Sequence, residues 1–241
     1  MAIIRTAFVA LMLALAVLFV LPWLVLGVVI IDRPDRMYWL AMKIVRSATR
    51  LLGVRVHVEG LENVPRGPCV FVANHTSTID PMALIPAIPQ RVGIVVKREL
   101  FRIPIFGTAM RVVQFVSVDR SDKESTTAVV PLAEQHLRNG LSYMFFSEGT
   151  RSEDGRLRPF KRGAFTLAIN ARVPVVPVSI VGAHRLMKKG HNVVYPGEVT
   201  IRFAPPVDAS AYTIEQRGDL IARVQAVVAA GLPQDQQPVS S

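Results

Sequence analysis

The chain has 241 residues, which is enough for one α/β domain with a sizeable core, alone or with an added anchor. Hydrophobic residues make up 51% of it, and 28 Lys and Arg against 18 Asp and Glu give a net charge of +10. This basic excess indicates an anionic partner, such as nucleic acid, anionic lipid or a phosphorylated metabolite, or it serves only solubility. The single cysteine, Cys69, excludes an internal disulfide and a cysteine-rich metal site.

The N-terminal part contains a long apolar segment, residues 7–31, without a charged side chain. As one helix it would extend about 37 Å at roughly 1.5 Å per residue, more than a hydrocarbon core of about 30 Å. It is longer than the apolar core of a usual signal peptide, and no small-residue cleavage site follows it, so we expect a retained membrane anchor. Pro22 leaves open a kinked single span or two short helices that enter and leave one leaflet.

Positive charges follow this apolar segment densely, whereas only Arg5 precedes it; those that follow are Arg33, Arg36, Lys43, Arg46 and Arg50. The positive-inside rule places the rest of the chain on the cytoplasmic face of a membrane, which we expect to be a bacterial inner membrane. From Asp35, which can cap a helix after Pro34, helical periodicity continues to about residue 52 with the basic side chains on one face. We expect this helix to lie on an anionic membrane surface. The alternative is an ordinary amphipathic helix packed on the domain core.

After Gly53, short β-branched runs alternate with helical stretches. The predicted strands are 54–58, 70–73, 93–96, 115–118, 143–146, 175–181 and 199–203, and the predicted helices are 81–87, 123–138, 163–170 and 214–230. This alternation favours an α/β fold with a mainly parallel central sheet flanked by helices. We therefore expect a membrane anchor with an interfacial helix over residues 1–52, one catalytic domain over 53–230 and a disordered tail over 231–241.

A polar segment, residues 74–80, directly follows the apolar run that ends at Ala73. Loops at strand ends are where α/β folds hold their functional sites. Asp80 followed by Pro81 predicts an N-cap with proline at the first helical position. A turn before this cap would let the Asp80 carboxylate accept the Nδ1 proton of His75 and leave Nε2 free as a general base.

The group that such a base would activate is not evident within the chain. No serine lies in a G-x-S-x-G motif, and Cys69 belongs to an apolar run that we expect to be buried. A substrate hydroxyl is then the nucleophile, and it attacks an acyl donor without an acyl-enzyme intermediate. Taken alone, the pair of residues is weak support, because a histidine satisfied by a local carboxylate is the simpler interpretation.

A second polar segment, residues 146–152, also follows an apolar strand. Gly149 permits close backbone approach, Thr150 supplies a hydroxyl, and Arg151 can hold a phosphate through two N–H groups. Glu148 could hold Arg151 or bond a substrate hydroxyl, and a tight turn with a surface ion pair is the alternative. A Walker motif is absent from the sequence, which argues against nucleotide hydrolysis. Nucleic acid is disfavoured because few aromatic residues accompany the basic ones.

Four blocks in order resemble those of the 1-acylglycerol-3-phosphate acyltransferase family. Residues 74–80 resemble its N-H-x4-D block, 116–120 its second block, 146–152 its F-P-E-G-T-R-S block and 173–178 its fourth. Residues 97–100 and 160–163 also resemble family elements, and the similarity covers roughly residues 54–203. Gln114 and Ser117 stand where the second block has Gly and Phe, and Ser147 stands where the third has Pro. These departures concern the acceptor more than the chemistry.

The resemblance implies a glycerolphosphate acyltransferase-like fold and transfer of a fatty acyl group from acyl-CoA or acyl-carrier protein to the free hydroxyl of a lysophospholipid. The first candidate acceptor is 1-acyl-sn-glycerol 3-phosphate, which gives phosphatidic acid, and a lyso-aminolipid is the alternative. His75 is implied as the catalytic base and Asp80 as the residue that orients it. Substrate contacts are implied for Asn74, Lys97, Arg120, Glu148, Gly149, Thr150 and Arg151, without a metal or redox cofactor. A lipid hydrolase using water at His75 and a non-catalytic lipid-binding protein remain as alternatives of other classes.

Overall fold

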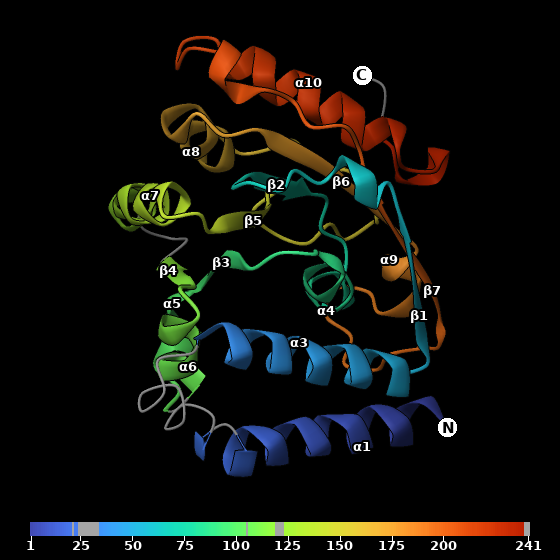
Figure 1. The fold of residues 1–241 in the computed structure, drawn as a ribbon. Helices are drawn as coiled ribbons and strands as arrows, with labels where there is room; N and C mark the ends of the chain where they lie inside the picture. Colours follow the sequence, from blue (N-terminus) through green and yellow to red (C-terminus); the bar gives the residue numbers. More distant parts are fainter. Residues whose placement is uncertain (21, 24–33, 105, 119–122, 239–241) are drawn as a thin grey trace.

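The structure is a computed structural model that describes the chain except residues 21, 24–33, 105, 119–122 and 239–241, and except the side chains of residues 20, 97, 118 and 123–129. Its centre is a 7-stranded sheet with the order β1-β7-β6-β2-β5-β3-β4 (Figure 1). The strands are β1 (Val54–Glu59), β2 (Val70–Ala73), β3 (Val92–Lys97), β4 (Val116–Val118), β5 (Ser142–Phe146), β6 (Val175–Val181) and β7 (Gly197–Phe203). All neighbours are parallel except β6 and β7. The predicted mainly parallel sheet is confirmed.

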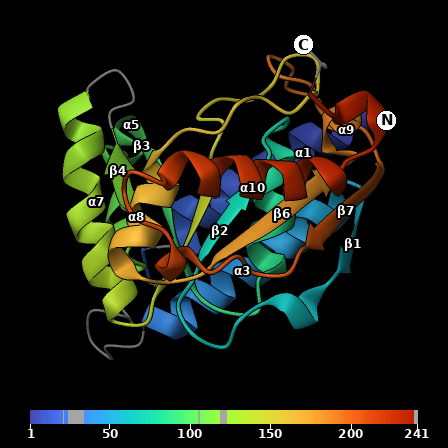
Figure 2. The same cartoon turned by 90° about the horizontal axis from the view of Figure 1, so that it is seen from above.

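Helices cover both faces of this sheet (Figures 1 and 2). One face carries α7 (Lys123–Arg138), α8 (Gly163–Ala171) and α10 (Arg217–Ala230), and the other carries α4 (Ile79–Leu84) and α3 (Pro34–Leu51). Outside α3 lie α1 (Ala2–Leu15) and the π-helical turn η1 (Ala16–Val20). The shorter elements are α5 (Arg98–Phe101), α6 (Phe106–Val112), α9 (Ala183–Leu186) and the 3-10 turns η2 (Leu61–Asn63), η3 (Ile85–Ala87), η4 (Ala209–Ala211) and η5 (Gln234–Gln236).

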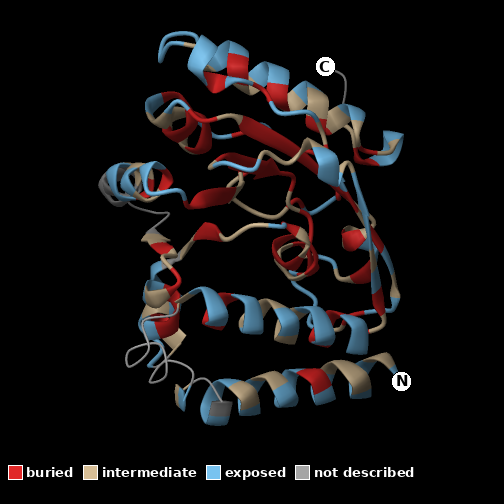
Figure 3. Ribbon diagram, in the orientation of Figure 1, coloured by how far each residue is buried: buried red, intermediate tan, exposed pale blue. Residues whose placement is uncertain are grey.

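The central strands are buried on both faces (Figure 3), since helices cover them on each side. This explains why β2 and β6 are apolar almost throughout rather than alternating. Phe71 of β2 belongs to the core beneath α3 and α4, and Val70 and Val72 belong to the core beneath α7, α8 and α10. The sheet is therefore a rigid base from which loops leave at the carboxyl ends of its strands.

The predicted basic helix is α3, and it packs on the domain core through Met37, Tyr38, Ala48 and Thr49. The packed amphipathic helix considered as the alternative is thus what the structure shows, and contact with a membrane stays a prediction. The predicted cap at Asp35 was wrong, because Asp35 lies in the first turn of α3. Its carboxylate instead pairs with the Arg91 guanidinium on the domain.

Helix α1 is long and apolar but barely buried. Among the described residues, one helical stretch, Ala2–Phe19, is long and apolar enough to cross a membrane, with 6% of it buried. Val9 is its buried residue, and the Thr6 hydroxyl accepts a hydrogen bond from the Val194 N–H at 3.1 Å. Residues 24–33 lie outside the described residues, so the choice between one span and a re-entrant pair stays a prediction.

The C-terminal tail was predicted to be disordered, and residues 231–238 contradict this. They contain η5, and the side chains of Leu232 and Gln236 are buried. The backbone carbonyl of Gln236 accepts a hydrogen bond from the Leu157 N–H at 2.8 Å. Residues 231–238 are ordered because they cap the core beside α10 and hold the loop after β5, which their polar composition did not reveal.

Candidate active site

The two polar segments predicted from the sequence meet at one edge of the sheet. Strands β2 and β5 are parallel neighbours in which Ala73 pairs with Phe146. Residues 74–80 and 147–152 therefore leave the sheet side by side, from strands that end at the same level. The backbone carbonyl of His75 accepts a hydrogen bond from the Ser152 N–H at 2.8 Å, which ties the segments together.

His75 and Asp80 form the predicted contact. The distance between His75 Nδ1 and Asp80 Oδ2 is 2.8 Å, and the exposed fractions of the two side chains are 14% and 0%. Asp80 Oδ2 also accepts hydrogen bonds from the backbone N–H groups of Thr76 at 2.6 Å and Ser77 at 2.8 Å. Because this oxygen is an acceptor toward all three, Nδ1 carries the hydrogen and Nε2 has a free lone pair.

The local fold that creates this contact differs from the predicted one. Helix α4 begins at Ile79 with Thr78 at its N-cap, so Asp80 and Pro81 lie within its first turn and the predicted cap at Asp80 was wrong. The Asp80 carboxylate points back to the loop and binds its N–H groups instead of those of the following turn. The turn thus closes from His75 to Asp80 and fixes the imidazole.

The ring of His75 is also held from its other side by Phe146, the last residue of β5. The two rings are stacked with centroids 4.1 Å apart and an interplanar angle of 18°. This role of Phe146 was not predicted, although the residue lies within the predicted segment 146–152. The available signal was its place at the end of a strand beside the one that leads to His75.

Glu148 makes backbone contacts that were not predicted. It is 3% exposed, and Oε1 accepts a hydrogen bond from the His75 N–H at 2.7 Å while Oε2 accepts one from the Arg158 N–H at 3.3 Å. Burial raises the pKa of Glu148 to about 8, and these two hydrogen bonds oppose that shift. The carboxyl group thus ties the backbone of the histidine loop to the chain after β5. Neither Arg151 nor open solvent is its partner.

Arg151 donates from Nη1 to the Thr78 hydroxyl at 2.5 Å, which places the guanidinium beside the start of α4. Gly149 has a φ of +76°, and a side chain there would collide with the aliphatic end of Lys161. The Lys161 amine therefore lies over the Gly149–Thr150 turn. Two cationic side chains thus border the segment predicted to bind phosphate.

Asn74 has internal partners. Its side-chain oxygen accepts a hydrogen bond from the Ile180 N–H at 2.7 Å, and its Nδ2 donates to the Ile180 carbonyl at 2.9 Å. The side chain is buried, so it clamps the end of β2 to β6. The predicted substrate contact of Asn74 has no support in this geometry.

The second block is described only in part. Residues 116–118 form β4, Arg120 lies outside the described residues, and Lys97 ends β3 with its side chain outside the description. Gln114, where the family has glycine, has a φ of +63°. Arg91 Nη2 donates to the side-chain oxygen of Gln114 at 3.2 Å, and the Tyr143 hydroxyl donates to the backbone carbonyl of Gln114 at 3.2 Å. These contacts hold a residue other than glycine in a left-handed conformation.

Replacing Gln114 tests this interpretation. Gln114→Ala keeps the left-handed strain but loses the Arg91 contact, so we expect the free energy of unfolding to fall by about 1 kcal/mol. Gln114→Gly also loses the contact but removes the strain, so we expect it to be more stable than the alanine variant by about 1 kcal/mol. Denaturant unfolding of both variants in detergent measures the difference, and equal stabilities would contradict the assigned strain.

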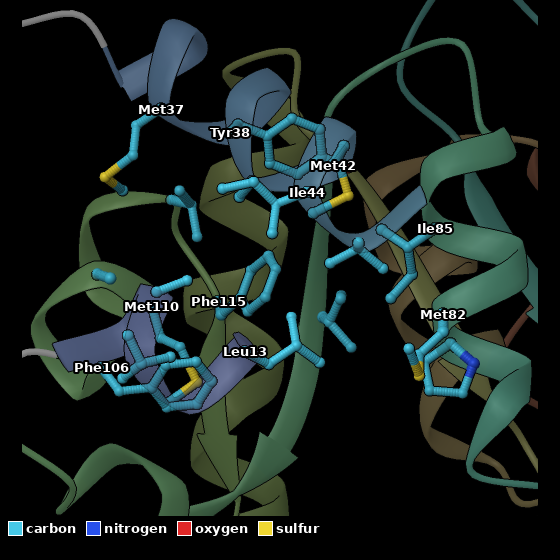
Figure 4. A pocket seen from close by; sticks show the side chains of 18 residues that line it. Leu13, Met37, Tyr38, Met42, Ile44, Met82, Ile85, Phe106, Met110 and Phe115 are labelled. Carbon is cyan, nitrogen blue, oxygen red and sulfur yellow. The ribbon is translucent and has the colours of Figure 1, made fainter. Parts of the chain in front are cut away.

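An apolar cavity of about 440 Å³ lies between α1, α3, α4 and α6 (Figure 4). Its lining is almost entirely apolar and includes Leu13, Met42, Met82, Phe106 and Phe115, which point into it in the figure. Pro81 also lines it, next to Asp80 in the chain. The cavity therefore reaches the first turn of α4, the turn that carries Asp80. Among the described residues, no group of three or more His, Cys, Asp or Glu side chains could hold a metal ion.

Comparisons with known proteins agree on one family. A family model described as Acyltransferase matches residues 55–181, the region that contains both polar segments. The chain is 37% identical to the chloroplastic 1-acyl-sn-glycerol-3-phosphate acyltransferase BAT2 of Brassica napus, over 65% of this chain and 46% of that protein. It thus spans about half the length of this relative. It is 32% identical to the 1-acyl-sn-glycerol-3-phosphate acyltransferase of Pseudomonas aeruginosa, over 73% of this chain and 68% of that protein.

A solved structure is similar over almost the whole chain. It is the crystal structure of the 1-acyl-sn-glycerophosphate acyltransferase PlsC from Thermotoga maritima, with a TM-score of 0.80 and 28% sequence identity. The similarity covers 95% of this chain and 94% of that one.

Proposed function

Because this chain belongs to the Acyltransferase family, we propose that it transfers a fatty acyl group from acyl-CoA or acyl-carrier protein to the free hydroxyl of a lysophospholipid. The first candidate acceptor is 1-acyl-sn-glycerol 3-phosphate, in line with the names of its relatives, and the product is then phosphatidic acid. The observation that carries the proposal is the His75–Asp80 contact at 2.8 Å beside an apolar cavity.

In this reaction His75 is the general base. Its Nε2 takes the proton of the acceptor hydroxyl as the hydroxyl oxygen attacks the thioester carbonyl carbon. The carbon–sulfur bond then breaks, the ester is formed, and the leaving thiolate takes the proton from the imidazolium. Asp80 stabilises the imidazolium through Nδ1, at the distance of 2.8 Å already given.

Direct attack by the substrate is favoured because the nearby protein nucleophiles are engaged or buried. The Ser77 hydroxyl donates to the Met187 carbonyl at 2.7 Å, and the Ser152 hydroxyl donates to Asp154 at 2.8 Å. Burial raises the pKa of the Cys69 thiol to about 12, which keeps it protonated. These groups support transfer without an acyl-enzyme intermediate.

The acceptor's phosphate would bind beside Thr150 at the Gly149 turn. Arg151 and Lys161 border that turn, and Arg151 matches a phosphate through two N–H groups. We assign Arg120 and Lys97 to the same anion site as expectations from the family resemblance. Glu148 and Asn74 act differently in this proposal, since they position the loops and do not contact the acceptor.

The apolar cavity would hold the fatty acyl chain. A substitution that fills part of the cavity should therefore change the preferred length of the acyl chain. Ala41 of α3 lines the cavity, so Ala41→Leu shortens the available space. We expect the preferred acyl chain of the donor to become shorter by about two carbons, because the isobutyl group that replaces the methyl group fills about that length. Competition between acyl-CoA donors of different length measures the shift. Ala14→Leu on exposed α1 is the matched control, and an equal shift in both variants would contradict this assignment.

The proposed location is a membrane, with the catalytic domain on the cytoplasmic face. The support is the apolar, largely unburied stretch Ala2–Phe19 and the basic residues that follow the apolar run. The exposed side chains of α1 include Ile4, Phe8 and Leu11, which would enter the hydrocarbon region. A lipid acceptor would then reach the site from the same surface.

An acceptor panel tests the proposed function. The purified full chain in detergent is given lysophosphatidate, glycerol 3-phosphate or zwitterionic lyso-lipids, each with acyl-CoA and acyl-carrier-protein donors. We expect lysophosphatidate to be acylated fastest. If only a different lyso-lipid were acylated, that lipid would be the acceptor in place of lysophosphatidate. Release of free fatty acid without an acceptor, at the rate of transfer, would indicate a hydrolase.

A further inference from the structure

A second cavity, separate from the apolar one, lies between the C-terminal half of α3, strand β1 and the α4–η3 segment. Its volume is about 620 Å³, and we call it the arginine groove because Arg46, Arg50 and Arg55 line it. Its apolar lining includes Val56, Ala83 and Ala87. Neither His75, Asp80 nor any residue of the segment 146–152 lines this groove. Helix α4 separates the two cavities, and Met82 borders both.

The charges of the groove are only partly neutralised by the protein. Arg55 pairs with Glu198 at 2.9 Å, whereas Arg46 and Arg50 have no carboxylate within 4.0 Å in the part of the chain that the structure describes. One Nη of Arg46 donates a hydrogen bond to the Pro86 carbonyl, and both arginine residues are exposed. Each keeps donors for an anion, and the planar guanidinium matches a phosphate through two parallel N–H groups.

The surroundings of the groove are apolar and exposed. Leu51, Val58 and Leu61 are 56%, 41% and 44% exposed, and the last two line the groove. Helix α1 lies against α3, and Val9 and Met12 of α1 share a hollow with Leu51 at the C-terminal end of α3. This brings the exposed apolar face of α1 to the same end of the molecule (Figure 1). A cationic groove beside such an apolar surface fits a molecule that has an anionic head and apolar chains.

We propose that the arginine groove binds one anionic phospholipid of the membrane, with its phosphate on Arg46 and Arg50 and an acyl chain along Val56 and Ala87. This lipid is neither donor nor acceptor, because the groove contains none of the catalytic residues. The proposal does not rest on the proposed reaction. It also differs from general attraction of the basic face of α3 to a membrane, because it requires a single saturable site.

The test uses the full chain in non-ionic detergent, titrated with dihexanoyl phosphatidylglycerol and followed by calorimetry. The double variant Arg46→Gln/Arg50→Gln removes the groove's unpaired charges. The matched control Arg36→Gln/Lys43→Gln removes the same charge from the same helix, and neither of its residues lines the groove. We expect one lipid per chain, with binding weakened about tenfold or more in the first variant and less than about twofold in the control. Dihexanoyl phosphatidylcholine should bind weakly to all three proteins.

Two further measurements distinguish binding of a lipid from binding of a simple anion. Ala87→Leu narrows the groove without changing its charge, and it should weaken phosphatidylglycerol binding if an acyl chain lies there. Inorganic phosphate at the same concentration should not displace the lipid. Equal loss in the two double variants would overturn the proposal in favour of diffuse attraction, and displacement by inorganic phosphate would overturn it in favour of a simple anion site. Circular dichroism of each variant confirms that the fold survives.

Discussion

Replacing His75 by alanine is expected to lower acyl transfer by about 10²–10⁴-fold, the usual effect of removing one general base. The substitution removes the only nitrogen that faces the acceptor hydroxyl in the proposed reaction, while the backbone contacts of His75 with Glu148 and Ser152 remain possible. The fold should therefore survive, since the imidazole is partly exposed and its removal leaves these backbone contacts in place. Initial rates with saturating donor and acceptor measure the loss in kcat.

Asp80→Asn provides the matched comparison. An asparagine oxygen can still accept the N–H groups of Thr76 and Ser77, but the neutral amide stabilises the imidazolium less than a carboxylate does. We expect a loss of transfer of similar order, with circular dichroism unchanged. Undiminished transfer by His75→Ala would remove His75 from the mechanism. Loss of the folded structure in either variant would instead assign the pair a structural task.

The sheet was predictable because its strands have a simple physical cause. Strands 70–73 and 175–181 are apolar almost throughout, as expected for strands covered on both faces, and both were predicted with their observed bounds. Helix starts were less accurate. Helix α10 begins at Arg217, three residues after the predicted start at 214, because the preceding segment includes a polar turn between Thr213 and Gln216. The short helices α5, α6 and α9 have too few turns for a periodic pattern.

The site was predictable where it is local and not where it depends on the fold. His75 and Asp80 lie in one loop, so their contact follows from five residues of chain. Glu148 is different, because its partners are backbone N–H groups of His75 and Arg158, and an amide leaves no mark in the sequence. The apolar cavity draws side chains from α1, α3, α4 and α6, which no single motif connects. Asn74 likewise finds its partner 106 positions away in β6.

Replacing Glu148 by glutamine is expected to change both transfer and the pH dependence of stability. The amide oxygen can accept the His75 N–H, but its NH₂ then faces the Arg158 N–H, so two donors meet. We expect transfer to fall by about tenfold through a less fixed histidine loop. The exposed loop residue Glu153, which pairs with Lys189, is the matched control, and Glu153→Gln should leave transfer unchanged.

The pH dependence follows from the direction of the pKa shift. Burial raises the pKa of Glu148 from 4.5 to about 8, so between these values the folded protein binds more protons than the unfolded chain. Its contribution to the free energy of unfolding is therefore fully present below about pH 4.5 and is lost as the pH rises to 8, by on the order of 2–4 kcal/mol. Glu148→Gln cannot titrate, so its stability should fall less than that of the wild type between pH 5 and pH 8. Denaturant unfolding at both pH values measures the difference, and parallel pH profiles would show that the buried carboxyl group does not keep its proton.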